Sequence, residues 1–173
     1  MPDGLLIIGI GNDYRGDDAA GLIVARLLQK KHPHCTVIED TGEGAALLDA
    51  WRGWQQVVLI DALRSGAPPG TIQRFDASAS ALPASLFAAS SHAFGVAQAV
   101  ELARALGELP RQMIVYGIEG LRFSAGVGLT PAVEQSAREV ARMIARYTDS
   151  STSASRPRRS SASSVKRLGT TAR

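Results

Sequence analysis

The 173-residue sequence has one cysteine, few aromatic residues and no long apolar segment. A lone Cys35 excludes an intramolecular disulfide and any CxxC metal or redox motif, and it is typical of a protein in a reducing compartment. No apolar run approaches the roughly 18–20 residues that span a bilayer, and the first residues lack the basic segment of a signal peptide. We therefore expect a soluble, cytoplasmic protein with no membrane partner.

Positive charge gathers at the C-terminus. The residues from 148 onward hold six of the 19 Lys and Arg against a single acid, so residues 1–147 carry a net charge of about −2. Residues 149–173 are rich in Ser and Arg and have almost no apolar side chains to offset the entropy cost of ordering. We expect one folded domain at 1–148, a disordered basic tail at 149–173, a monomer, and no nucleic-acid partner.

Apolar runs and helical patterns alternate along the predicted domain. Apolar residues recur at helical spacing in 19–31, 44–53, 93–107 and 129–148, and 76–92 is predicted to be a loop with one helical turn. Strands are predicted at 5–10, 35–40, 56–62, 71–75 and 112–120, with 71–75 at an edge of the sheet. This order predicts an α/β fold: a three-layer α/β/α sandwich with a mainly parallel five-stranded sheet.

A glycine loop follows the first predicted strand, but it does not match a nucleotide site. The segment GIGNDY at 9–14 has tyrosine where a dinucleotide fingerprint needs its third glycine, and no Gly-Lys-Ser/Thr of a P-loop is present. Asp13, Asp17 and Asp18 crowd the helix start where a pyrophosphate would bind. One of the adjacent pair, Asp17 or Asp18, can cap the helix while the other points into the crevice at the strand ends.

Two further residues are candidates for the same crevice. Asp61 follows four apolar residues of the third strand. A carboxylate in such apolar surroundings must pair with a positive charge, bind a metal ion or accept hydrogen bonds from backbone amides of the next loop. His92 precedes a predicted helix, where a histidine can equally be an ordinary helix-start residue. His32 and His34 are predicted to be surface residues. Together Asp18, Asp61 and His92 predict an open site for a divalent first-row metal ion.

The same segments resemble the hydrogenase maturation proteases, the C-terminal processing endopeptidases of NiFe-hydrogenase large subunits. The resemblance covers about 5–147 and rests on four segments in order: GIGNDYRGDDAAGL, LIDALRSGAPPGTI, SSHAFG, and VYGIEG with the later FSAGVGLTPAVEQSA. It implies an α/β/α sandwich in which Asp18, Asp61 and His92 contact the metal and carry the catalysis.

The resemblance also implies a substrate and the origin of the metal. The family removes a C-terminal extension from a large-subunit precursor that is already loaded with nickel, and the site metal is the nickel of that precursor. Hydrolysis would then be metal-assisted, with the ion polarising the scissile carbonyl or activating water. An alternative from another class is a non-catalytic nickel-sensing or chaperone module that uses the same three residues.

Overall fold

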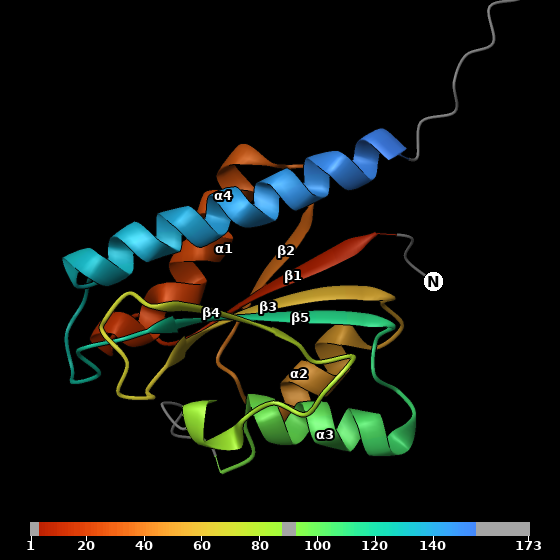
Figure 1. The fold of residues 1–173 in the computed structure, drawn as a ribbon, viewed down its shortest axis with the longest axis horizontal. Coiled ribbons are helices and arrows are strands. Elements are labelled where there is room, and N and C mark those ends of the chain that lie inside the picture. The colour runs from red at the N-terminus through yellow and green to blue at the C-terminus, as the bar shows by residue number, and fades with distance from the viewer. Residues whose placement is uncertain (1–3, 88–92, 155–173) are drawn as a thin grey trace, which may run out of the picture.

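The structure, a computed structural model, describes residues 4–87 and 93–154. Its centre is one five-stranded sheet in the order β2-β1-β3-β5-β4. Four strands run parallel, whereas β4 lies at one edge and pairs antiparallel with β5 (Figure 1). The strands are β1 (Leu5–Ile10), β2 (Thr36–Asp40), β3 (Gln56–Leu63), β4 (Ile72–Asp76) and β5 (Gln112–Glu119). The predicted sheet, with 71–75 as its edge strand, is confirmed.

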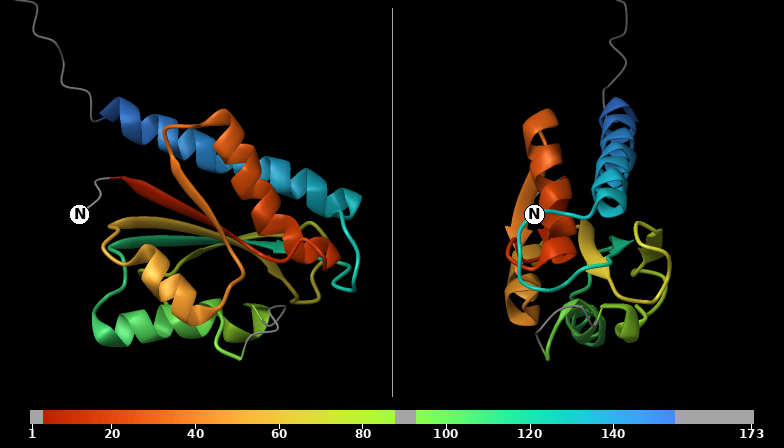
Figure 2. Two further views of the ribbon diagram at one scale, coloured as in Figure 1. Left: turned by 180° about the vertical axis from the view of Figure 1, so that it is seen from behind. Right: turned by 90° about the vertical axis from the view of Figure 1, so that its left-hand side faces the viewer.

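Helices cover both faces of this sheet. Helices α1 (Ala20–Lys31) and α4 (Pro131–Ala154) lie on one face, and α2 (Gly44–Trp51) and α3 (Val96–Leu106) lie on the other (Figure 2). Successive residues of β1 and β3 alternate between the two cores, as strand geometry requires. Ile7 and Val58 pack with α1 and α4, whereas Ile8 and Leu59 pack with α2 and α3. The three-layer α/β/α prediction is therefore confirmed.

Two short 3-10 helices complete the described chain. One is η1 (Gly16–Ala19), directly before α1, and the other is η2 (Ala84–Phe87), which is the helical turn expected within 76–92. Within residues 4–87 and 93–154, no helix is both long enough and apolar enough to cross a membrane.

The last helix runs past the predicted domain end. Helix α4 continues to Ala154, so the expected boundary at residue 148 falls inside it. Thr148 is still buried, and helix formation is cooperative, so the helix extends beyond its last packed turn although Ser-rich residues follow. Residues 155–173, which make up most of the predicted disordered tail, lie outside the described residues.

Candidate active site

The N-terminus of α1 packs closely against the carboxyl ends of β1 and β3. A methyl group at Gly21 would overlap the carbonyl oxygens of Ile10 and Ile60, and one at Gly9 would overlap the carbonyl oxygen of Gly21. Glycine at these positions permits a backbone approach that no other residue allows. The short helix η1 is thereby held over the carboxyl ends of the two strands, the edge where open α/β sheets place their ligands.

The first aspartate of the glycine loop is held by a salt bridge. The Arg26 guanidinium donates to both carboxylate oxygens of Asp13, each at 2.8 Å, and it also donates to Glu39. The hydrogen bond from Arg26 lowers the pKa of Asp13. Asp13 therefore anchors the loop to α1 and to the adjoining strand β2.

Asp17 is fully buried and binds a different part of the chain. Its carboxylate accepts hydrogen bonds from the backbone amides of Leu121 and Arg122, both at 2.9 Å, and from the amide of Thr130 at 2.7 Å. The hydroxyl of Thr130 also donates to it. Burial raises the pKa of Asp17, but these hydrogen bonds outweigh burial and the pKa is lowered overall. Neither η1 nor α1 receives a side-chain cap, so Asp17 fixes the 121–130 loop instead of capping its own helix.

The third aspartate, Asp18, lies beside Asp61. The two residues are 6% and 4% exposed, and the backbone amide of Ala62 donates to Oδ1 of Asp61 at 2.8 Å. Burial, together with the negative charge of Asp18, raises the pKa of Asp61 to about 8. Near neutral pH this favours a protonated Asp61 in the free protein, because burial disfavours the ionised carboxylate and the charge of Asp18 adds to that effect.

Asp61 lies within its strand, which runs one residue further than the predicted 56–62. Strand β3 continues to Leu63, and Asp61 stands opposite Gly117 of β5. The strand is longer because its partner β5 extends equally far, to Glu119. The backbone amide that donates to Asp61 at 2.8 Å belongs to Ala62, which lies in the same strand.

A divalent cation fits this pair of carboxylates. Carboxylate oxygens ligate such ions, and a cation would replace the proton that otherwise relieves the repulsion between Asp18 and Asp61. Glu119, also buried at this edge, is engaged differently: it accepts hydrogen bonds from the Ser65 and Gly66 amides and the Ser65 hydroxyl. Glu119 therefore holds the loop after β3, whereas Asp18 and Asp61 form the candidate ligand pair.

His92, the predicted imidazole ligand, lies outside the described residues. The described chain resumes at Ala93, and the carbonyl oxygen of Phe94 accepts from the Gly44 amide at 2.9 Å. The Phe94 ring packs on Gly44, where any side chain would overlap it. The segment that follows His92 is thus anchored at the N-terminus of α2, close to the carboxyl end of β2. The role of His92 stays a prediction, as do the catalytic and metal-binding roles of Asp18 and Asp61.

A comparison with protein-family models places the chain. The model described as hydrogenase maturation protease matches residues 22–147, well over half of the 173 residues. The chain belongs to the hydrogenase maturation protease family. The match includes Asp61 and His92 and begins four residues after Asp18.

Two curated relatives match most of the chain. The hydrogenase expression/formation protein HupD of Thiocapsa roseopersicina is 27% identical over 164 residues, which cover 86% of this chain and 73% of the relative. The hydrogenase 2 maturation protease of Escherichia coli is 29% identical over 135 residues, covering 75% of this chain and 81% of the relative.

Solved structures share the fold of this family member. The hydrogenase maturating endopeptidase HybD from E. coli superposes with a TM-score of 0.70 at 21% identity, covering 86% of this chain and 93% of its own. The NiFe-hydrogenase maturation protease HybD from Thermococcus kodakarensis gives a TM-score of 0.67 at 24% identity, covering 84% and 99%. At such identities the superpositions support the α/β/α architecture.

Sequence reasoning missed the residues that support the pair. Arg26 lies thirteen residues from Asp13 and looks like any basic residue on a helix surface. The partners of Asp17 are more than 100 residues away along the chain. No local pattern signals such contacts, because the first depends on how the glycine loop folds against α1 and the second on how the 121–130 loop folds back over η1.

Proposed function

We propose that this protein is the endopeptidase that removes a C-terminal extension from a nickel-loaded NiFe-hydrogenase large-subunit precursor. The geometry of Asp18 and Asp61 carries the proposal, because two buried carboxylates lie side by side at the edge where open α/β sheets place their ligands. Membership of the hydrogenase maturation protease family supports the reaction class. The names of the relatives, including a maturation protease and a maturating endopeptidase, support the substrate class.

In this proposal the nickel belongs to the substrate and is recognised by Asp18, Asp61 and His92. Nickel accepts carboxylate and imidazole ligands, and a metal ion polarises a scissile carbonyl or activates water. Both carboxylates become ionised when they bind the ion, so Asp61 releases its proton as the precursor docks. A site that keeps this proton in the free state holds free nickel weakly, which favours nickel presented by a precursor.

Amide hydrolysis also requires a proton carrier. A C–O bond forms between water and the carbonyl carbon, the C–N bond breaks, and one proton from the water reaches the leaving nitrogen. One carboxylate of the pair takes up that proton and delivers it.

The test is cleavage of a large-subunit precursor, followed by intact-mass spectrometry. The precursor is offered with and without nickel, and we expect shortening of the nickel-loaded form only. Asp18→Asn, Asp61→Asn and His92→Ala should each abolish shortening while circular dichroism shows a retained fold. Asp49→Asn, which alters an exposed carboxylate of α2 bonded to Arg52, is the matched control and should leave the cleavage rate unchanged.

The outcomes separate the two function classes. Binding of nickel-loaded precursor without shortening would support the nickel-sensing or chaperone alternative and overturn the endopeptidase proposal. Shortening that is indifferent to nickel would overturn the role given to the ion. Full activity in both Asp18→Asn and Asp61→Asn would show that the reaction takes place elsewhere.

A further inference from the structure

A second cluster of metal-ligating side chains lies at the far end of α1 from the candidate active site. Asp18 lies two residues before the first residue of this helix, and His32 directly follows its last residue. The helix has 12 residues, so the two places are separated by about 18 Å along its axis. His34 precedes β2, and the cluster therefore sits at the amino ends of the strands, opposite the Asp18–Asp61 edge.

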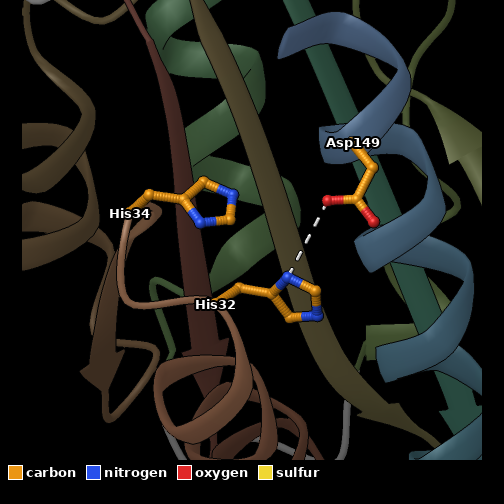
Figure 3. A group of neighbouring side chains, drawn as sticks. All are labelled: His32, His34 and Asp149. Atoms are coloured by element: carbon orange, nitrogen blue, oxygen red, sulfur yellow. Dashed lines mark ion pairs between the residues drawn. The ribbon is translucent and has the colours of Figure 1, made fainter. Parts of the chain in front are cut away.

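Three side chains converge in this cluster, which consists of His32, His34 and Asp149. One ligand atom from each lies within 4.8 Å of the other two. Nδ1 of His32 is 4.0 Å from Oδ1 of Asp149, and the two imidazole rings meet edge to face at 5.7 Å between centroids. Figure 3 shows the histidines on the connection after α1 and the aspartate on α4, facing one another across the gap.

The donor set and its spacing suit a transition-metal ion. Imidazole is a preferred ligand of zinc and nickel, and two imidazoles with one carboxylate form a common three-ligand set. Metal–ligand bonds of 2.0–2.1 Å place tetrahedral ligands about 3.4 Å apart, so small side-chain rotations would close the present spacing. His34 and Asp149 are exposed, so rotation and water access are unhindered.

We infer that His32, His34 and Asp149 form a second metal site, which takes one divalent first-row ion of the zinc and nickel type. The remaining coordination positions are open to water. A bound ion ties the connection between α1 and β2 to the last turns of α4, two segments more than 100 residues apart. Lys31 precedes His32 in the chain and carries a positive charge, and only three protein ligands are available, so binding should be weaker than at a closed four-ligand site.

Metal binding at this cluster can be measured separately from binding at the candidate active site. The sequence has three histidines in total, and one of them is His92 of the candidate active site. The double variant Asp18→Asn/Asp61→Asn serves as the background, because it removes the carboxylate pair of the other site. Untagged, EDTA-treated full-length protein is titrated calorimetrically with ZnCl2 and, separately, with NiCl2.

We expect the background variant to bind one ion and to melt at a higher temperature when the ion is present. Adding His34→Gln or Asp149→Asn should weaken binding at least about tenfold and remove the metal-dependent rise in Tm. Adding Glu139→Gln, an exposed carboxylate of α4, or His92→Gln should leave both readouts unchanged. Melting without metal checks that each variant folds.

Two results would overturn the second site. One is a background variant that binds neither ion. The other is undiminished binding after His34→Gln or Asp149→Asn. Neither result bears on precursor cleavage, so this inference and the proposed function stand or fall separately.

Discussion

Replacing Asp61 by Asn should make the metal-free protein more stable at neutral pH and above. Asn has the shape of the protonated aspartic acid, and its carbonyl oxygen can still accept the Ala62 amide hydrogen bond. It carries no charge, so it removes both the desolvation of a carboxylate and its repulsion from Asp18. The substitution thus separates the stability of the site from its proposed activity, which it should abolish.

The size of the effect follows from the shifted pKa of Asp61. The folded chain raises this pKa from an ordinary 3.8 to about 8, so the folded state binds the proton more tightly than the unfolded state. Wild-type stability is therefore highest below the unfolded pKa and is lost as the pH rises through 4 towards 8. Each pH unit in this window costs about 1.4 kcal/mol, so wild type should lose about 3 kcal/mol between pH 5.5 and pH 7.5 from this group.

The assay is urea unfolding of wild type and Asp61→Asn in EDTA-containing buffer at several pH values. The difference in unfolding free energy should grow by about 3 kcal/mol from pH 5.5 to 7.5, or roughly 6–12 °C in Tm for a chain of this size. Asp49→Asn, at an exposed carboxylate, should follow wild type at every pH. Parallel curves for wild type and Asp61→Asn would refute the buried proton and, with it, the electrostatic argument for the site.

Two further substitutions test how the site is supported. Asp17→Asn replaces the charged acceptor of the Leu121 and Thr130 amides by a neutral amide group. It should lower the free energy of unfolding, measured in urea, by about 1.5–3 kcal/mol. Wild-type stability of this variant would show that the 121–130 loop does not depend on the carboxylate. Gly21→Ala forces a methyl group into the Ile10 and Ile60 carbonyl oxygens, so circular dichroism should show that this variant does not fold. The control is Gly53→Ala: no atom lies near this position, and its positive φ should lower the free energy of unfolding by only about 1 kcal/mol. A folded, stable Gly21→Ala protein would contradict the close approach of α1 to the sheet.

The sequence alone was sufficient to predict the architecture. Buried parallel strands are continuous apolar runs and surface helices are apolar at every third or fourth residue, so both appear in the local pattern. The edge position of 71–75 also follows locally, because this segment mixes polar with apolar residues, whereas the buried strands are continuous apolar runs. The end of α4 was misplaced because helix extension past Thr148 depends on cooperativity with packed turns, and no composition rule measures that.

The roles within the acidic loop were decided by tertiary structure. Asp13, Asp17 and Asp18 have the same side chain and stand within six residues, so sequence offers no way to rank them beyond the family resemblance. What distinguishes them is the partner that folding brings: an arginine for Asp13, distant backbone amides for Asp17, and a second buried carboxylate for Asp18. A carboxyl group responds to the charges and donors within a few ångströms, and residues far apart in the chain supply them only once the chain has folded.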